Sequence, residues 1–193
     1  MGEKKEKPYK WRREDYRENT KGLLMVNTGD GKGKTTAALG VLIRAAGRGL
    51  KCCFIQFMKS RTDRYGEHES LEQLGIEFHT MGDGFTWDTN DPAQDIKTSE
   101  ETWQLCVEKM RSSDYELLVF DELVYVLDYK FLDVEKVLAE IKAVRESQPH
   151  LHLIFTGRNA PPELVEAADL VTEMKEIKHP FHAGIFAQQG IEF

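Results

Sequence analysis

A glycine-rich segment near the amino terminus holds the residues best suited to binding phosphate. It spans residues 28–36 and reads TGDGKGKTT. Its second half fits the end of the GxxxxGK(S/T) phosphate loop, while Thr28 stands in the slot of the first glycine. Gly29 and Gly31 still supply flexibility, so backbone N–H groups can converge on phosphate oxygens at the positive N-terminus of a following helix. The segment therefore predicts a site for the phosphates of ATP.

Charged and hydroxyl side chains of this phosphate loop would complete the site. Lys34 adds a mobile positive charge, and the Thr35 hydroxyl can ligate magnesium. Lys32 is either a second phosphate contact or a solvated lysine. A chance glycine-rich turn is the alternative, and the strand and helix patterns on either side disfavour it. The predicted nucleotide-binding residues are Gly29, Asp30, Gly31, Lys32, Gly33, Lys34, Thr35 and Thr36.

Two adjacent carboxylates, Asp121 and Glu122, follow the apolar run LLVF. In phosphate-loop proteins, an acidic residue at the end of an apolar strand holds magnesium directly or through water. Which of the two would touch the metal stays open, and a loop carboxylate or a helix cap is the alternative for both. Arg158 follows another apolar run, where an arginine can hold phosphate oxygens with two hydrogen bonds. Its alternative is a surface arginine in a turn.

Further polar and aromatic residues have two possible roles each. Lys59, just past a predicted strand, faces either the ligand or solvent. Phe85 and Trp87 sit in a glycine-containing loop where no core periodicity requires them. They either pack against the protein or line a site for a large flat ligand. The histidines in strand-like stretches fit packed or solvated positions better than metal ligation: His79, His150 and His152.

Beyond the phosphate loop, predicted strands and helices alternate along the chain. Apolar runs predict strands over residues 22–27, 51–58, 75–80, 116–120, 150–156 and 170–177. Apolar residues at helical spacing predict helices over 35–48, 67–74, 91–110 and 161–168, and one capped by Asp133 that carries Val144. Asp91 followed by Pro92 is a typical helix start. We predict a loop over 81–90 and irregular structure over 178–193.

This alternation predicts an α/β fold with a mostly parallel sheet of about six strands and helices on both faces. Ligands in such folds sit at the carboxyl ends of the strands. The phosphate loop, the carboxylate pair and Arg158 should therefore meet at one edge. The polar, aperiodic residues 1–21 indicate a mobile arm, and residues 22–193 form one domain.

The composition disfavours several functional classes. The chain has 193 residues and a formal net charge of −7. That charge is unsuited to unspecific nucleic-acid binding, and no apolar run approaches the ~20 residues that cross a bilayer. The cysteines are odd in number and form no CxxC pair, so we expect buried small side chains in a reducing cytoplasm rather than disulfides or a zinc site. They are Cys52, Cys53 and Cys106.

Several short motifs, taken in order, resemble one enzyme family. The motifs TGDGKGKTT, QFMKS, GFTW, FDEL and TGR, with the closing HPF, AG and AQQGIEF, are similar to those of the P-loop ATP:corrinoid adenosyltransferases of cobalamin synthesis and corrinoid salvage. The resemblance covers residues 22–193. It implies a RecA-like P-loop fold and a homodimer. It also implies transfer of the 5′-deoxyadenosyl group of ATP to the cobalt of a reduced cob(I) corrinoid, with release of triphosphate.

The resemblance assigns roles to particular residues. Residues 29–35 would bind the triphosphate. Thr35 with Asp121 or Glu122 would hold magnesium. Phe85 and Trp87 match the aromatics below the corrin ring, which exclude the lower axial ligand and ease the reduction of cobalt by a donor such as a reduced flavin protein. Two positions depart from the family pattern: Ser60 replaces a usual glycine, and Phe186 replaces an expected basic residue.

Two other functions compete with adenosyl transfer. The first is an ordinary P-loop ATPase or kinase, in which Glu122 would polarise water or a substrate hydroxyl for attack on the γ-phosphorus. The GFTW loop has no task in that case. The second is a sensor of ATP or corrinoid that binds without turnover. The products separate these possibilities, since only adenosyl transfer releases intact triphosphate.

Overall fold

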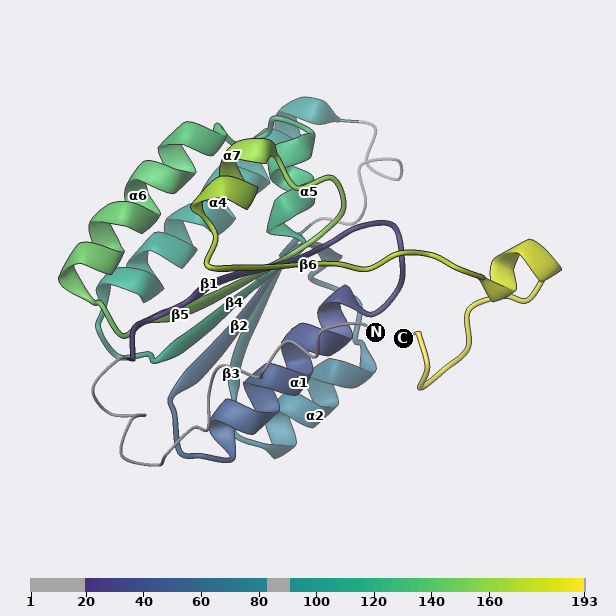
Figure 1. The fold of residues 1–193 in the computed structure, drawn as a ribbon. Coiled ribbons are helices and arrows are strands. Elements are labelled where there is room, and N and C mark those ends of the chain that lie inside the picture. Colours follow the sequence, from purple (N-terminus) through teal and green to yellow (C-terminus); the bar gives the residue numbers. More distant parts are fainter. Residues whose placement is uncertain (1–19, 83–90, 193) are drawn as a thin grey trace, which may run out of the picture.

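The computed structural model describes residues 20–82 and 91–192. Within them, strands and helices alternate as the sequence predicts (Figure 1). The strands are β1 (Leu24–Thr28), β2 (Cys52–Ser60), β3 (Glu77–Gly82), β4 (Leu117–Asp121), β5 (His152–Thr156) and β6 (Leu170–Glu173). The helices are α1 (Lys34–Ala46), α2 (Gly66–Gln73), α4 (Pro92–Arg111), α5 (Leu123–Asp128), α6 (Val134–Ser147), α7 (Pro162–Ala167) and the 3-10 helix η2 (Pro180–Ala183).

The six described strands form one sheet in the order β3-β2-β4-β5-β1-β6. Every neighbouring pair is parallel, which confirms the predicted sheet. β4 lies beside β5, and β5 lies beside β1. The loops that follow these three strands therefore leave the sheet next to one another, at the edge where parallel sheets bind ligands.

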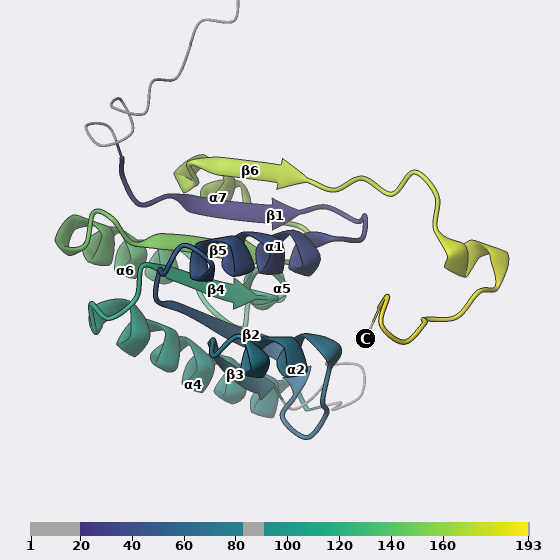
Figure 2. The same ribbon diagram turned by 90° about the horizontal axis from the view of Figure 1, so that it is seen from below.

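Helices cover both faces of the sheet (Figure 2). On one face, Ala38 and Leu42 of α1 and Leu71 of α2 pack in a core with Phe54 and Val119 of the central strands. The helices α4 to α7 cover the other face and enclose the larger core. Side chains of a strand point alternately to the two faces. A sheet that is buried on both sides therefore requires the near-continuous apolar runs of β2 and β4.

Two helix starts confirm the capping predictions. The Asp91 side chain accepts hydrogen bonds from the backbone N–H groups of Ala93 and Gln94 at the start of α4. Asp133 accepts one from the N–H of Lys136 at the start of α6. Each carboxylate satisfies donors that the first helical turn leaves unpaired and complements the positive end of the helix.

Several element limits differ from prediction. Helix α5 was not predicted, because it is only six residues long and too short to show a helical period. Strand β2 continues to Ser60, which pairs with Gly82 beyond a register shift, so Lys59 lies within the strand rather than after it. Strand β6 ends at Glu173 because its partner β1 ends at Thr28. The segment predicted as irregular contains η2.

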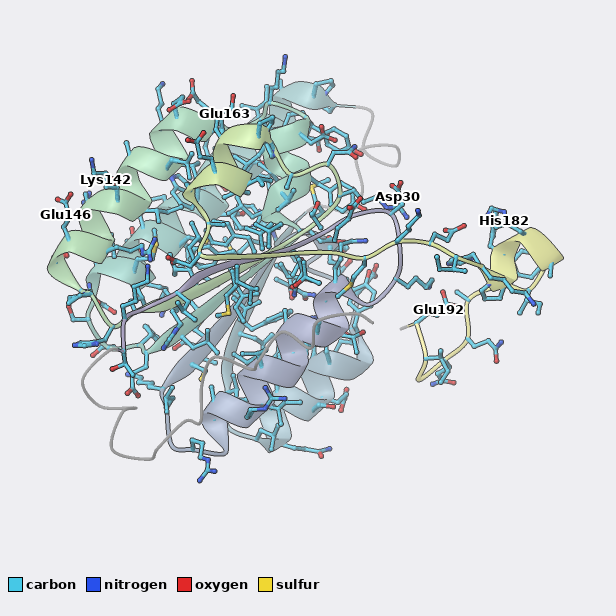
Figure 3. All side chains as sticks on the ribbon, viewed as in Figure 1. Asp30, Lys142, Glu146, Glu163, His182 and Glu192 are labelled. Atoms are coloured by element: carbon cyan, nitrogen blue, oxygen red, sulfur yellow. The ribbon has the colours of Figure 1, made fainter. Side chains whose placement is uncertain are left out.

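The chain after β6 extends away from the body and then returns (Figures 1 and 2). Figure 3 shows His182 on the outer part of this segment and Glu192 turned back toward the loop that carries Asp30. The Glu192 carboxylate forms an ion pair with Lys32 of the phosphate loop. The carboxyl-terminal segment, residues 174–192, therefore reaches the predicted nucleotide site.

The described part of the chain also bears on two predictions from composition. All three cysteines are buried and free, in β2 and α4. Burial raises the pKa of the Cys52 thiol to about 11, so the group is a neutral thiol at pH 7. None of the described helices is both long and apolar enough to cross a membrane.

Candidate active site

The phosphate loop joins β1 to α1 with a backbone that requires glycine. Gly29 (φ 93°) and Gly33 (φ 109°) adopt conformations that residues with a Cβ rarely take. A Cβ on Gly29 would also lie 2.4 Å from the carbonyl oxygen of Met174. The glycines thus serve both the turn of the loop and its contact with the chain after β6.

Met174 holds the phosphate loop by two backbone hydrogen bonds. Its N–H donates to Thr28 O (2.8 Å), and its carbonyl accepts from Gly31 N (2.7 Å). A Cβ on Gly31 would lie 2.9 Å from that carbonyl oxygen. The loop is therefore fixed by β1 and α1 at its ends and by Met174 at its middle.

Lys34 begins α1, and its side chain folds back over the loop. The ammonium donates to Gly29 O (2.7 Å) and to Gly31 O (2.8 Å). Burial and the nearby charge of Arg158 lower the pKa of Lys34, although Asp30 and Glu122 act in the opposite direction. An ammonium at the centre of the loop can transfer its hydrogen bonds to phosphate oxygens that enter there.

A row of buried polar side chains lies on the sheet face that α1 and α2 cover. Its members are Gln56 in β2, Asp121 in β4 and Thr156 in β5, each at most 1% exposed. Gln56 and Asp121 are direct neighbours in the register of the sheet. Strand side chains alternate between the two faces of a sheet. Each of these polar groups therefore lies on the same face as apolar side chains that precede it in its own strand. The row meets the start of α1 at the carboxyl edge.

Asp121 is fully buried and accepts three hydrogen bonds. The hydroxyls of Thr35 (2.8 Å) and Thr156 (2.6 Å) donate to Oδ1, and the Gln56 amide donates to Oδ2 (3.1 Å). A buried carboxylate needs such donors, because it has lost its hydration. The bond from Thr35 also leaves the lone pairs of that hydroxyl oxygen free to face a ligand.

Glu122 has a strained backbone and an unsatisfied side chain. Its φ of 65° is rare for a residue with a long side chain. The backbone N–H donates to the Thr156 hydroxyl (2.9 Å) and so fixes this turn. Among the described residues, Glu122 Oε2 is the buried side-chain polar atom that has no hydrogen-bond partner. Burial first, and repulsion by Asp121 second, raise the pKa of Glu122 to about 8.

These carboxylates fit a divalent cation. Glu122 has a buried carboxylate oxygen without a donor, and the Thr35 hydroxyl, which is bonded to the adjacent Asp121, has free lone pairs; both are oxygen ligands of the kind that magnesium prefers. A cation there would also relieve the repulsion that raises the pKa of Glu122. Asp121 is less available, since three donors already occupy its oxygens.

The sequence did not decide whether Lys59 faces the ligand or solvent, and it did not identify Glu67 as the ion-pair partner of Lys59. The Lys59 ammonium lies 2.5 Å from Glu67 Oε1 and 4.3 Å from the centre of the Tyr65 ring. Burial alone would lower the pKa of Lys59, but Asp121, Glu67 and Glu122 together raise it. Lys59 thus faces the site and compensates its negative charge. The missed residues are Gln56, Tyr65, Glu67 and His68; the available signal was Gln56, a polar residue inside the apolar run of β2.

The other predicted site residues lie in different surroundings. Asp30, Thr36 and Arg158 are exposed, and Arg158 is close enough to Lys34 to affect its pKa. Lys32 is paired with Glu192. Of the two departures from the family pattern, Ser60 ends β2 and Phe186 is exposed in the carboxyl-terminal segment. Phe85 and Trp87 lie outside the described residues, in a segment that follows the end of β3.

Together, the parallel sheet, the glycine loop at a helix start and the carboxylates at the neighbouring strand end define a P-loop nucleotide-binding protein. A solved structure has the same fold: the flagellar accessory protein FlaH from Methanocaldococcus jannaschii superposes with a TM-score of 0.54. The match covers 79% of this chain and 70% of that chain at 9% sequence identity. At that identity, the likeness shows the RecA-like fold alone.

Sequence comparison identifies the family. The family described as "ATP:corrinoid adenosyltransferase BtuR/CobO/CobP" matches residues 20–193. Corrinoid adenosyltransferases of Sinorhizobium sp and Pseudomonas aeruginosa are 44% and 41% identical to the chain; each match covers 90% of it, and 81% and 84% of the relatives. "Corrinoid adenosyltransferase CobA" of Salmonella typhimurium is 38% identical over 90% of this chain and 86% of its own. The chain belongs to the ATP:corrinoid adenosyltransferase family.

Proposed function

We propose that this protein transfers the 5′-deoxyadenosyl group of ATP to the cobalt of a corrinoid and releases triphosphate, in the synthesis or salvage of cobalamin. The family match over residues 20–193 carries this proposal. The structure supports it through a phosphate loop whose lysine, hydroxyl and neighbouring carboxylates gather at one edge of the sheet. The substrate's own reduced cobalt is the nucleophile, so the protein supplies alignment and stabilises the leaving triphosphate.

The phosphate loop would bind the triphosphate. Lys34 would exchange the carbonyl oxygens of Gly29 and Gly31 for phosphate oxygens, which carry a full charge and bind an ammonium more strongly. Arg158 would stabilise the same charge from the exposed side of the loop, and Lys32 would do so after leaving Glu192. These contacts gain strength as negative charge collects on the leaving group, which favours the transition state.

Thr35 and Glu122 would hold magnesium. Glu122 has the unpartnered oxygen, whereas Asp121 would act by holding the Thr35 hydroxyl with its lone pairs turned outward. Bound magnesium would neutralise charge on the triphosphate. Lys59 would limit the repulsion between the carboxylates when the metal leaves, because its ammonium, which is paired with Glu67, also attracts the charges of Asp121 and Glu122.

The corrinoid would bind beside the nucleotide at the same edge. Phe85 and Trp87 follow β3, whose carboxyl end lies two strands from Asp121 in the sheet order. We assign to them the apolar wall against the lower face of the corrin ring, which excludes an axial ligand and eases cobalt reduction. The reducing agent would be a protein with a reduced flavin. Residues 1–21 would close over the corrinoid as an arm attached to the domain of residues 22–193.

We further propose a homodimer in the cytoplasm. The carboxyl-terminal segment exposes five apolar side chains, and surfaces of this kind favour contact with another chain. They are Ile177, Phe181, Ile185, Phe186 and Ile191. The free, buried cysteines suit a reducing compartment.

Product analysis tests the proposed reaction. The protein is incubated with ATP, magnesium and chemically reduced cob(I)alamin, and the corrinoid absorption spectrum and the phosphate products are followed. We expect an adenosylated corrinoid and one equivalent of triphosphate. Formation of ADP and orthophosphate would instead indicate an ATPase or kinase, and binding without turnover would indicate a sensor.

A further inference from the structure

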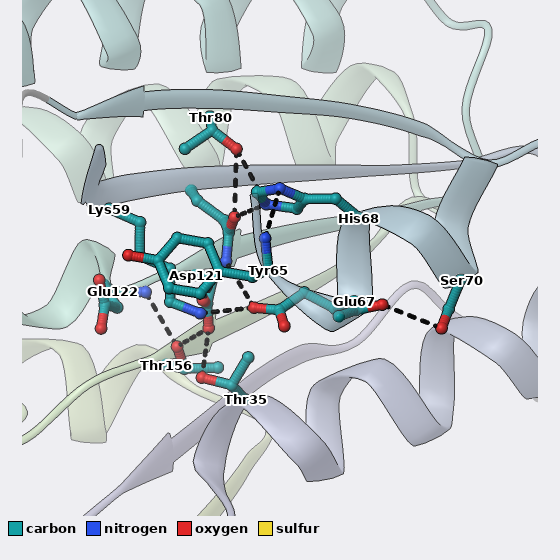
Figure 4. A network of polar contacts seen from close by, with 12 residues as sticks. Thr35, Lys59, Tyr65, Glu67, His68, Ser70, Thr80, Asp121, Glu122 and Thr156 are labelled. Carbon is teal, nitrogen blue, oxygen red and sulfur yellow. Dashed lines mark hydrogen bonds and ion pairs between the residues drawn. The ribbon is translucent and has the colours of Figure 1, made fainter. Parts of the chain in front are cut away.

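A buried chain of polar groups leads from Asp121 along the face of the sheet to helix α2 (Figure 4). Its central members are Gln56, which is fully buried, and His68, which is 3% exposed. Neither forms a hydrogen bond with the phosphate loop, and the reaction proposed above assigns them no task. Buried polar groups cost free energy unless they are hydrogen-bonded, so a connected chain of them calls for a functional explanation.

The two ends of the Gln56 amide face different kinds of hydrogen-bond partner: donors lie at its oxygen and carboxylate acceptors lie at its nitrogen. Its oxygen accepts from the ring of His68 (2.6 Å) and from the Thr80 hydroxyl (3.2 Å). Its nitrogen donates to Asp121 Oδ2 (3.1 Å) and to Glu67 Oε1 (3.4 Å). If the amide were turned around, its oxygen would face two carboxylates and its N–H groups would face a ring N–H. The observed orientation is the one in which every partner is satisfied.

His68 fixes that orientation. Its Nδ1 accepts a hydrogen bond from the backbone N–H of Tyr65 (3.4 Å), the residue that precedes α2. In a neutral ring, Nε2 must then carry the proton and donate to Gln56. Burial lowers the pKa of His68, which agrees with a neutral ring. The ring also stacks on Phe78, with 4.9 Å between ring centres, and is held in its plane.

We propose that His68 and Gln56 are positioning residues for the magnesium–triphosphate site. His68 orients the Gln56 amide, the amide holds Oδ2 of Asp121, and Oδ1 is left turned toward the Thr35 hydroxyl. This inference rests on the proposed magnesium site at Thr35 and Glu122. It adds that the ligand geometry of Thr35 is set from α2, three hydrogen bonds away through Asp121 and Gln56.

Substitutions at His68 separate a polar role from a packing role. His68→Phe keeps a ring to stack on Phe78 but removes both nitrogens, whereas His68→Gln removes the ring and keeps an N–H at about the position of Nε2. Positioning through hydrogen bonds predicts that the glutamine variant works better than the phenylalanine variant. Packing alone predicts the reverse order. Gln56→Met provides a second test, because it keeps the length of the side chain and removes both polar ends.

Binding of ATP is measured by calorimetry on the full chain without corrinoid, first with EDTA and then over a range of magnesium concentrations. A hydrogen bond to a charged group is worth about ten- to hundredfold in an equilibrium constant. We expect His68→Phe and Gln56→Met to raise the magnesium concentration for half-saturation by at least about tenfold. His68→Gln should stay within about threefold of wild type, and ATP affinity in EDTA should change by less than about threefold in all variants.

Several outcomes would overturn the inference. One is a His68→Phe or Gln56→Met protein with wild-type magnesium dependence; another is a His68→Gln protein that is more impaired than His68→Phe. Equal losses with EDTA and with magnesium would show a structural role, and thermal unfolding identifies variants that do not fold. If wild type itself bound ATP independently of magnesium, the proposed metal site would fail and this inference with it. A magnesium-dependent wild type with unaffected variants would reject the positioning role alone.

Discussion

The contact between the phosphate loop and Met174 gives a prediction whose size follows from the structure. An alanine at Gly31 would place its Cβ 2.8 Å from the carbonyl carbon of Lys175 and 2.9 Å from the carbonyl carbon and oxygen of Met174. Ordinary contact begins at 3.4 Å, so backbone groups must separate by about 0.6 Å. The separation also strains the hydrogen bond from Gly31 N to Met174 O (2.7 Å). Forced overpacking of this kind costs about 1–3 kcal/mol.

That free-energy cost can lower either the stability of the folded protein or its affinity for ATP. If the loop keeps its shape, Gly31→Ala lowers the free energy of unfolding by about 1–3 kcal/mol. If the loop shifts instead, the same free energy appears as weaker ATP binding, about 5- to 150-fold. Denaturant unfolding and calorimetric ATP binding measure the two terms. Gly40→Ala is the matched control, because Gly40 lies in α1 with nothing within 4 Å of an added Cβ, and we expect it to stabilise by up to about 1 kcal/mol. A Gly31→Ala protein with wild-type stability and wild-type ATP affinity would refute this account of the loop.

Three further predictions concern charge, pH and the corrinoid. Lys34→Ala should lower activity by at least about tenfold, the value of one lost charge-assisted contact, as steady-state kinetics with ATP will measure. Glu77 is held by Lys109 and other donors: burial raises its pKa, but the hydrogen bonds prevail and lower it from 4.5 to about 2. A carboxyl group whose folded-state pKa lies below its unfolded value stabilises the folded protein above pH 4.5. Glu77→Gln should therefore lose up to about 1 kcal/mol of stability at pH 7 after solvent screening, and the difference in stability from wild type should vanish as pH falls toward 2. Phe85→Ala and Trp87→Ala should impair adenosylation of cob(II)alamin with a mild flavin reductant far more than that of pre-formed cob(I)alamin, with ATP affinity unchanged.

Each of these predictions has a result that contradicts it. Near-normal turnover of Lys34→Ala with unchanged apparent ATP affinity would remove the phosphate loop from the mechanism. For Glu77, a stability difference that persists at pH 2 would show that packing rather than charge is responsible. For Phe85 and Trp87, equal losses with both forms of the corrinoid would indicate general packing, and no loss with either would place the corrinoid elsewhere.

The sequence was sufficient for features that are local or periodic. The phosphate loop could be predicted because glycines, Lys34 and Thr35 stand between a buried strand and a helix, and each residue type has a physical task in phosphate binding. The carboxylate pair could be predicted because it ends an apolar run. The sheet followed from the alternation of strands and helices, and its parallel pairing agrees.

The contacts between site residues on neighbouring strands depend on strand order, which the sequence does not reveal. β2 lies next to β4 although α2, β3 and α4 separate them in the chain, and this order brings Gln56 beside Asp121. Lys59 was left undecided because its orientation depends on a register shift between Gln56 and Ser60. Glu122 gave no sign of its left-handed backbone, since that conformation follows from the bond of its N–H to Thr156.

Asp121 explains why the phosphate loop and the sheet form one site. Thr35, Thr156 and Gln56 come from α1, β5 and β2, and all three donate to this one side chain. An asparagine of the same shape has one acceptor oxygen and an NH2 group, so it could not accept from donors on both sides. A carboxyl side chain has acceptor oxygens on both sides, and those of Asp121 accept from all three donors. The start of α1 is thereby tied to β4 and, through Asp121, to β5 and β2, and the adjacent Glu122 keeps a buried oxygen without a hydrogen-bond partner.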